Sequence, residues 1–420
     1  MEFENGNKQM RVFMPSNILL PKAEKISKWA VIACDQFTSQ PEYWNRVRNY
    51  VGEEVSSLNL ILPEVELNRD YSTAVRLINA NMESYITNEI FTEYSNAYVY
   101  VERTLTNGKI RKGIVGMIDL EEYDYSCNSK SKIRATEKTV EKRIPPRKKI
   151  RENAALELPH VILLCDDERN IIIKELTQNK NNFRKLYELD LMEKGGHVVG
   201  WLIQGEDAKK LSSRLNDYSD TMIHKYSGVS QHTMLFAVGD GNHSLATAKA
   251  CYEEMKKIYT AEELMHNPAR YALVELENIY DESIRFEAIH RLIKGINPEH
   301  LLNEMKKISS ETGEPVEWYM GENKGAIYLK KENNKLPVEI LQPFLDEYLE
   351  QYGGTIDYIH GDEVVKRLAI EKNTVGFLLP KIEKDRLFQN IILHGEYPRK
   401  TFSMGHAQEK RYYIEARKIK

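Results

Sequence analysis

The sequence has few cysteines and no long apolar run. Its four cysteines, Cys34, Cys127, Cys165 and Cys251, are scattered over 420 residues without a C-x-x-C pair or a histidine at metal-ligand spacing. This argues against a disulfide scaffold or a thiolate zinc site and favours a reducing compartment. No stretch approaches the roughly 18 apolar residues of a membrane span, and the first residues lack a signal core. We therefore expect a soluble, cytoplasmic protein.

Familiar catalytic and nucleotide-binding motifs are also missing. The chain contains no G-x-x-x-x-G-K-[ST], no G-x-G-x-x-G, no G-x-S-x-G and no H-E-x-x-H. Standard P-loop, Rossmann, hydrolase-elbow and zincin sites therefore lose support. The formal charge of -4 argues against general nucleic-acid binding, which usually needs a basic face. We expect a small-molecule partner, and neither nucleic acid nor membrane.

The densest signal that is present lies between Met234 and Glu254. An apolar run up to Val238 predicts a buried strand, Gly239 and Gly241 bracket Asp240 in a turn, and helical spacing begins at His243. A glycine-rich turn that opens a helix suits a phosphate or carboxylate, with Asn242 or Ser244 as a cap. Asp240 could hold a metal and His243 could transfer a proton. A capped turn without a ligand is the simpler alternative.

Helices and strands are mixed along the chain without strict alternation. Apolar periodicity predicts helices at 42–55, 74–88, 181–191 and 207–226, and strands at 97–105, 110–120, 160–165, 170–176 and 197–204. Asn107-Gly108 predicts a hairpin turn, and Pro145-Pro146 are expected to interrupt any helix. The pattern favours an α+β fold with a mixed sheet over a doubly wound one. We expect a main α+β domain over 1–285, a smaller α/β domain over 286–385, and a tail over 386–420.

The most basic part of the chain lies at 134–151. Glu137 and Thr139 are followed there by a cluster of cations that includes Arg143 and Arg147. Arginine binds phosphate through two parallel hydrogen bonds, and a carboxylate nearby could accept the proton of a substrate hydroxyl. The segment therefore suits a ligand, whereas a solvated charged loop is the simpler alternative.

Two polar groups follow in the last third of the chain. His290-Arg291 lies among apolar residues, where a histidine usually packs in a core or on a helix face and a ligand role is the alternative. The tail interleaves Lys400, Thr401, Lys410 and other polar residues with aromatics. It could be a disordered basic end, or it could return and lend charges to a ligand pocket.

Four of these elements, in this order, resemble the bacterial and archaeal family of domain of unknown function 1015. They are Glu137-Lys138-Thr139, Gly239 to Ser244, His290-Arg291 and Pro398-Arg399-Lys400-Thr401. The D-G-H-H-R signature of the family corresponds to 240–244, where Asn242 and Ser244 replace its first histidine and its arginine. Its H-E-x-T element corresponds to 136–139, with Thr136 in place of the histidine. The resemblance covers most of the chain and implies no activity, because the family has none assigned.

The turn is also similar to D-G-H-x-R turns of the ParB and sulfiredoxin-like superfamily. In that superfamily the turn contacts nucleotide phosphates, and some members phosphorylate free serine with a nearby glutamate as base. The similarity implies a ParB/sulfiredoxin-like core around the turn, phosphate bound at 240–244, and Glu137 as the base. Arg143, Arg147 or Lys400 would then replace the charge of the signature arginine.

The leading hypothesis is a phosphotransferase that acts on a small hydroxylated metabolite such as serine, with ATP or ADP and Mg²⁺ as cofactors. Glu137, Asp240 and His243 are its predicted catalytic residues, and Asp240 is also the predicted metal ligand. The residues expected to bind phosphate or ligand are Gly239, Gly241, Asn242, Ser244, Thr139, Arg143, Arg147, His290, Arg291, Lys400 and Thr401. The alternatives are a non-catalytic nucleotide- or metabolite-binding regulator and a phosphoester hydrolase. The oligomeric state stays open, a homodimer included.

Overall fold

The computed structural model describes residues 12–67, 70–141, 144–330 and 335–420. The chain forms two compact units: unit 1 comprises the residues up to Ile284 together with His406–Lys420, and unit 2 comprises Arg285–Gly405. The stretch expected to form one tail at 386–420 is therefore divided between the two units. The Gly405 N–H donates a hydrogen bond to the Arg285 carbonyl at 3.3 Å. The chain thus enters and leaves unit 2 at adjacent points.

Unit 1 is built on a mixed sheet of 11 strands among the described residues, in the order β10-β11-β4-β5-β13-β9-β12-β7-β6, with β1 beside β5 and β2 beside β4. The pairs β7–β12, β9–β13 and β6–β7 are parallel, and the other pairs are antiparallel. This is the expected α+β class with a mixed sheet. The strands are β1 (Phe13–Met14), β2 (Ser16–Pro21), β4 (Phe91–Thr104), β5 (Ile110–Asp119), β6 (Tyr123–Asp124), β7 (Ile133–Ala135), β9 (Ile162–Cys165), β10 (Lys185–Leu191), β11 (Gly196–Ile203), β12 (Phe236–Asp240) and β13 (Tyr271–Asn278).

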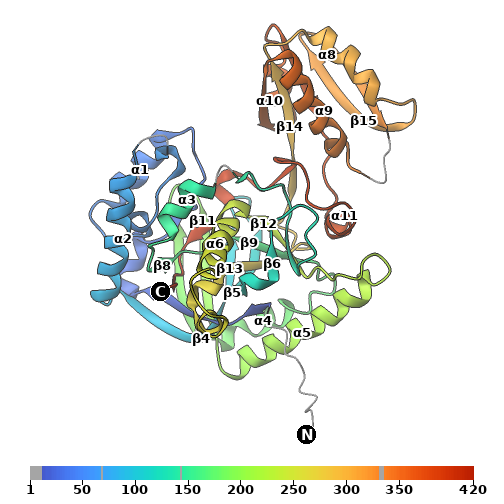
Figure 1. The fold of residues 1–420 in the computed structure, drawn as a ribbon. Helices are drawn as coiled ribbons and strands as arrows, with labels where there is room; N and C mark the ends of the chain where they lie inside the picture. Colours follow the sequence, from blue (N-terminus) through green and yellow to red (C-terminus); the bar gives the residue numbers. More distant parts are fainter. Residues whose placement is uncertain (1–11, 68–69, 142–143, 331–334) are drawn as a thin grey trace. The chain divides into compact units, whose positions relative to one another are not determined.

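Seven α-helices of unit 1 lie within the described residues, and α3 and α6 run side by side (Figure 1). They are α1 (Pro41–Val51), α2 (Ser72–Thr87), α3 (Ile144–Arg151), α4 (Lys174–Asn179), α5 (Glu206–Tyr226), α6 (Asn242–Met255) and α7 (Ala261–His266). Two small ladders pair β3 (Val31–Ile32) with β20 (Tyr412–Tyr413) and β8 (Leu156–Glu157) with β21 (Arg417–Lys418).

The C-terminal segment 406–420 is part of the apolar interior of unit 1. One buried cluster joins Trp44 of α1 to Tyr412 and Tyr413, and a second joins Trp29 to Ala416 and residues of α2. Side chains this deeply buried contribute roughly 1.5–3 kcal/mol each to folding. The segment is therefore a structural part of unit 1 rather than a disordered basic end.

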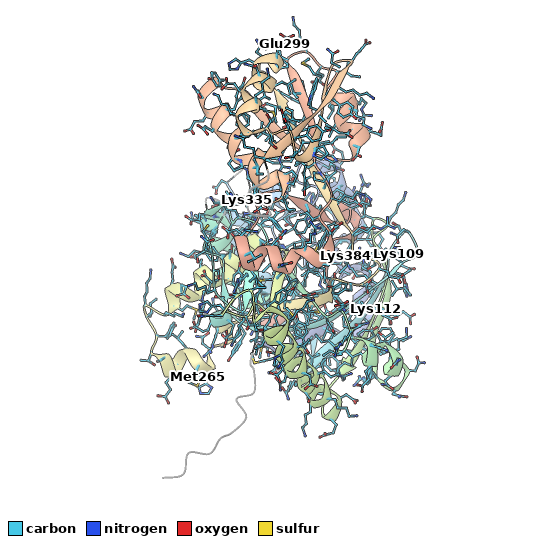
Figure 2. The ribbon with its side chains drawn as sticks, turned by 90° about the vertical axis from the view of Figure 1, so that its right-hand side faces the viewer. Lys109, Lys112, Met265, Glu299, Lys335 and Lys384 are labelled. Carbon is cyan, nitrogen blue, oxygen red and sulfur yellow. The ribbon has the colours of Figure 1, made fainter. Side chains whose placement is uncertain are left out.

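The hairpin between β4 and β5 follows its local sequence closely. Gly108 has a φ of 80°, and Asn107 accepts a hydrogen bond from the backbone N–H of Lys109 through its side-chain oxygen. Lys109, directly after this turn, is labelled in Figure 2. Glycine adopts this left-handed conformation without steric cost, which is why Asn-Gly is typical of such turns. The predicted hairpin is confirmed.

Three local predictions are wrong. The stretch predicted as a helix at 181–191 contains β10, because its alternating residues pair with β11. The stretch predicted as a strand at 170–176 is a turn that leads into α4; the Asp167 side chain holds this turn by accepting the N–H of Ile172. Pro145 and Pro146 do not interrupt a helix, since α3 begins at Ile144 and places both prolines in its first turn. Proline is tolerated there because those N–H groups have no partner within the helix.

Unit 2 is a separate antiparallel sheet with helices. Its strands follow the order β16-β15-β18-β14-β17, with β19 beside β14, and a buried cluster that includes Leu341, Leu345 and Phe377 packs α9 on them. The elements are β14 (Phe286–Lys294), α8 (Pro298–Glu304), β15 (Gly313–Met320), β16 (Asn323–Lys330), α9 (Pro337–Tyr352), β17 (Thr355–His360), α10 (Asp362–Leu368), β18 (Thr374–Leu378), α11 (Leu387–His394) and β19 (Phe402–Met404). Within the described ranges, no helix of either unit combines the length and apolar character that a bilayer crossing requires.

Candidate functional site

The turn between β12 and α6 opens the helix without a side-chain cap. Gly241 is the N-cap residue, with φ 79° and ψ 24°, and a glycine has no side chain that could cap the first helical turn. The predicted capping by Asn242 or Ser244 is therefore wrong, because both residues are already inside the helix. The first N–H groups of a helix have no intrahelical acceptor and carry the positive end of its dipole. This end of α6 suits an anion.

Gly241 is required at this turn for two reasons. Its positive φ is costly for any residue with a Cβ, and a Cβ placed there would lie 3.0 Å from the His160 Cδ2 atom and 3.0 Å from the Val161 Cα atom. Gly239 lies where the register between β12 and β9 shifts, between Val238 and Asp240. The backbone thus approaches the start of β9 closely.

The sheet topology brings Glu137 beside the turn. Because β7 runs parallel to β12, the carboxyl ends of both strands lie at one edge of the sheet. The loop after β7 is tied to the turn by two hydrogen bonds: the Thr136 hydroxyl donates to the Val238 carbonyl at 2.6 Å, and the Val140 N–H donates to the His243 Nε2 atom at 3.2 Å. The predicted base and the predicted anion site therefore come together within unit 1.

Thr136 and Asn242 contact each other; these are the two residues that replace histidines of the family elements. The Asn242 side-chain N–H donates to the Thr136 hydroxyl at 3.5 Å, and Thr136 is fully buried. The Asn242 Oδ1 atom and the hydroxyl of nearby Thr139 are buried without a hydrogen-bond partner among the described residues. Buried polar atoms nearly always have partners, so these two atoms are candidates to bind a ligand.

Lys410 from the C-terminal segment supplies a cation to the turn. Its Nζ atom lies 3.3 Å from the Asp240 Oδ2 atom, and its side chain is only 10% exposed. The guanidinium of Arg103 on β4 fixes the backbone on this side, because it donates to the carbonyls of Gln408, Glu409 and Lys410. Because Asp240 balances its charge, Lys410 adds hydrogen-bond donors beside the helix amides rather than a net positive charge.

A second charged pair, Asp35 and His160, lies on the other side of Gly241. The His160 Nε2 atom is 3.6 Å from the Asp35 Oδ2 atom, and its Nδ1 atom is 3.0 Å from the Tyr413 hydroxyl. Burial opposes the charge of His160, yet Asp35 raises the pKa of His160 well above its ordinary value. Burial likewise opposes the charge of Asp35, yet the His160 imidazolium and the Lys410 ammonium lower the pKa of Asp35. The pair is therefore ionised at neutral pH.

An apolar cavity of about 140 Å³ adjoins the first turn of α6. Most of its lining is apolar and includes Leu60, Met82 and Ile150, and its polar lining includes Ser244, His160 and Glu157. Arg147 also lines this cavity, and its guanidinium forms an ion pair with Glu64. The cavity can accept the apolar part of a ligand whose anionic part lies at the α6 turn.

The cations near the turn differ from those predicted. Arg143 lies outside the described residues, Arg147 pairs with Glu64, and Lys400 belongs to unit 2. The structure instead brings Lys410 and His160 to the turn. The sequence prediction missed His160, Asp35 and Tyr413. The signal that could have identified two of them is their place at the ends of apolar runs, since Asp35 follows the run 30–34 and His160 precedes the run 161–165.

The His290-Arg291 pair and the 398–401 segment meet each other within unit 2. Arg291 is fully buried and donates to the carbonyls of Lys400 and Ile289 and to the Gln342 side chain. The Thr401 hydroxyl donates to the Pro398 carbonyl at 2.6 Å. Arg291 thus anchors the 398–401 turn within unit 2.

His290 has both ring nitrogens in hydrogen bonds. Its Nδ1 atom accepts the N–H of Leu379 at 3.1 Å, and its Nε2 atom lies 2.9 Å from Asp362. Burial lowers the pKa of His290 despite the nearby carboxylate, which favours the neutral ring. The ligand roles predicted for His290, Arg291, Lys400 and Thr401 remain predictions.

The metal predicted at Asp240 finds little support in the donor set. The described residues contain no group of three or more His, Cys, Asp or Glu side chains suited to a metal ion, and Lys410 already neutralises the Asp240 carboxylate. Magnesium is often held by one or two carboxylates together with substrate phosphates. The residues present therefore do not form a protein-only magnesium site.

Comparison with known proteins gives one family and several distant structures. Residues 13–418 match the family described as Protein of unknown function (DUF1015). A mutant free serine kinase in complex with ADP is 11% identical, with 73% of this chain and 92% of that chain covered and a TM-score of 0.39. A conserved hypothetical protein from Pyrococcus furiosus is 12% identical, with 72% and 94% covered and a TM-score of 0.37. A C-terminally truncated SbnI from Staphylococcus aureus is 9% identical, with 69% and 82% covered and a TM-score of 0.37. A search of curated proteins gives no match.

Proposed function

Because the chain belongs to the DUF1015 family, which is described as of unknown function, we propose a function from its own site: binding of a nucleotide through its phosphates at the α6 turn, and transfer of a phosphoryl group to a small hydroxylated metabolite such as serine. One observation carries the proposal. The first turn of α6 has no side-chain cap, and Lys410 and the His160–Asp35 pair lie beside it. Helix amides without a side-chain cap favour phosphate oxygens, and the Lys410 ammonium can donate a hydrogen bond to the same oxygens.

In this proposal the amides of 242–244 and the hydroxyl of Thr139 bind phosphate oxygens, and Lys410 neutralises charge that develops during transfer. The oxygen of the acceptor hydroxyl forms a bond to the terminal phosphorus, the bond from that phosphorus to its bridging oxygen breaks, and the nucleoside diphosphate or monophosphate that leaves keeps the electron pair on that oxygen. The hydroxyl proton passes to the carboxylate of Glu137. Phosphoryl transfer depends mainly on positioning and electrostatics, which these groups can supply.

Glu137 is a better candidate for the base than Asp35. A general base works best when its pKa lies near the working pH. The pKa of Asp35 is lowered by His160 and Lys410, so that its carboxylate is a weak base. We assign Asp35 to holding His160 in its charged form.

The test begins with nucleotide binding. We expect calorimetry to detect ADP and ATP binding to the full-length protein and a loss of about tenfold in affinity for Lys410→Met, because a charge-assisted hydrogen bond to phosphate is worth about 1.5–3 kcal/mol. Lys418→Met removes an exposed lysine of the same segment and should leave the affinity unchanged. Absence of nucleotide binding at millimolar concentration would refute the proposal.

Turnover is tested separately with ATP or ADP, Mg²⁺ and a panel of amino acids and sugars. A phosphorylated product is expected from the wild-type protein, and Glu137→Gln should lower the rate at least a hundredfold while nucleotide affinity is kept. One contact favours a second candidate, a non-catalytic nucleotide-binding regulator: His243 Nε2 already accepts the Val140 N–H and is not available to a substrate. Tight binding with no conversion of any acceptor would support the regulator.

A further inference from the structure

A second, polar cavity of unit 1 is not used by the nucleotide proposal. It has a volume of about 400 Å³, and its lining includes Phe37, Tyr43, Arg46, Lys194 and Gln408. The rings of Phe37 and Tyr43 are stacked, with centroids 3.8 Å apart and planes 13° from parallel. The cavity thus has an aromatic wall and a charged side.

Two segments of the chain, 34–37 and 408–413, contribute residues to both this cavity and the apolar cavity. Cys34 and Tyr413 line the apolar cavity, whereas Phe37 and Gln408 line the polar one. The two segments are held together by pairing of β3 with β20 and by the Ala33 N–H, which donates to the Arg411 carbonyl at 2.8 Å. Asp35 and Lys410, the charged residues of the α6 turn, therefore lie on the stretches that connect the two cavities.

The charges of the polar cavity select for an anionic group. The Arg46 guanidinium donates twice to one Glu193 oxygen, with the shorter bond at 2.6 Å, so this pair is neutral overall. Lys194 forms no ion pair with any residue in the part of the chain that the structure describes. The amide side chains of Gln40 and Gln408 can both donate and accept hydrogen bonds. One net positive charge with amide groups beside it suits a carboxylate.

One wall of the polar cavity is the turn that joins β10 to β11. Glu193 and Lys194 have φ values of 53° and 62°, and the Gly195 N–H donates to the Met192 carbonyl at 3.1 Å. Positive φ at both central residues is typical of a two-residue hairpin turn. Phe37, with a φ of 53°, is a bulky residue in the left-handed region, where such residues are uncommon. The hairpin turn thus fixes the backbone that carries Lys194 at the cavity.

We propose that the polar cavity binds the acceptor of phosphoryl transfer, a small metabolite that carries both a carboxylate and a hydroxyl. The carboxylate pairs with Lys194 beside the Gln40 and Gln408 amides, and the hydroxyl end faces the side on which Asp35 and Lys410 lie. This inference rests on the proposed function, since it names the acceptor class for the same site.

The test measures acceptor binding and nucleotide binding side by side on the full-length protein. The probes are L-serine and D-glycerate, with glycerol as the match that lacks a carboxylate, and ADP as the nucleotide. We expect L-serine or D-glycerate to bind, glycerol to bind at least tenfold more weakly, and Lys194→Gln to weaken the carboxylate probes at least tenfold without a change for ADP. Lys185→Gln removes an exposed lysine of the same hairpin and is the control.

The outcomes separate the two proposals. Equal affinity of Lys194→Gln and wild type for the carboxylate probes overturns the acceptor site, as does glycerol binding as tightly as glycerate or no binding of any probe. Failure of ADP to bind counts against the proposed function instead. Loss of both ADP and carboxylate binding in Lys194→Gln would show that the variant perturbs the fold, which circular dichroism checks. The charge-conserving variant Lys194→Arg then decides. Probe binding by Lys194→Arg supports the site, and its absence in a folded Lys194→Arg overturns it.

Discussion

At the scale of single residues, the charge balance of the α6 turn depends on His160. Its ring touches Gly241, its Nδ1 atom contacts Tyr413, and its charge is maintained by Asp35. The Asp35 side chain is 29% exposed, so that water reaches the pair from one side. A histidine held in this way is a permanent cation near neutral pH rather than a proton shuttle.

The pair predicts a pH dependence of stability. Because the pKa of His160 is raised, its charged form contributes fully to the stability of the fold below pH 6.5, the ordinary pKa of histidine. This contribution to the free energy of unfolding is lost as the pH rises from 6.5 through the raised pKa. A lowered pKa for Asp35 adds stability above its ordinary value of 3.8, which is lost as the pH falls. The full contribution is therefore present between pH 3.8 and 6.5.

His160→Gln should lower the free energy of unfolding by about 2 kcal/mol in this window, since a hydrogen bond to a charged group is worth about 1.5–3 kcal/mol. The difference from wild type should shrink as the pH rises above 6.5. Urea unfolding from pH 5 to 9 measures it. His197→Gln, which removes an exposed histidine beside Asp190, should have little effect at any pH. A pH-independent difference for His160→Gln would contradict the ion pair.

At the scale of elements, the segment 406–420 connects the site to the core of unit 1. It pairs with β3 and β8, contributes Tyr412 and Ala416 to buried clusters, and carries Lys410 to Asp240. The position of Lys410 depends on the Arg103 guanidinium, which donates to three consecutive carbonyls of the segment and to the Gly195 carbonyl. A planar guanidinium is needed because one ammonium group cannot reach all four acceptors.

Arg103→Lys should therefore loosen the segment. Buried carbonyls that lose their donor cost about 1–3 kcal/mol, and we expect faster hydrogen exchange at 408–413 together with weaker nucleotide binding through Lys410. Hydrogen exchange followed by mass spectrometry measures both the local and the global effect. Arg76→Lys, on the exposed face of α2, is the matched control. Unchanged exchange at 408–413 in Arg103→Lys would show that the carbonyl contacts do not hold the segment.

At the scale of the whole molecule, unit 2 is an insertion in unit 1. Unit 1 resumes at His406 after unit 2, and Arg285 and Gly405 are joined by a hydrogen bond at 3.3 Å. Every residue of the proposed phosphate site, from Glu137 to Lys410, belongs to unit 1. Unit 2 has its own apolar core and its own anchored turn at 398–401.

Excision of unit 2 tests this organisation. Replacement of Arg285–Gly405 by a short Gly-Ser linker should give a folded unit 1, because the two ends to be joined are already adjacent. ADP should bind to it within about threefold of the full-length affinity, as measured by calorimetry, since the phosphate site is complete without unit 2. A folded unit 1 that fails to bind ADP, while the full chain binds it, would show that unit 2 contributes to the site.

The sequence by itself determined the features that depend on neighbouring residues. The strand, glycine turn and helix at 236–255, the Asn-Gly hairpin and the mixed α+β class follow from local periodicity and from the backbone preferences of glycine. The same patterns misassigned β10, because its residues suit either period and pairing with β11 decided between them. They also missed that Gly241, rather than Asn242 or Ser244, occupies the N-cap position at the start of α6.

Only the tertiary structure decided which distant groups meet at the turn. The parallel pairing of β7 with β12 places Glu137 at the edge where α6 begins, and the returning segment adds Lys410. His160 arrives because β9 begins at that same edge. Contacts between residues more than a hundred positions apart are set by sheet order and strand direction, which leave no periodic trace in the chain. The strand, turn and helix at 236–255 could thus be predicted from the sequence, whereas the ion pairs that lie beside the turn could not.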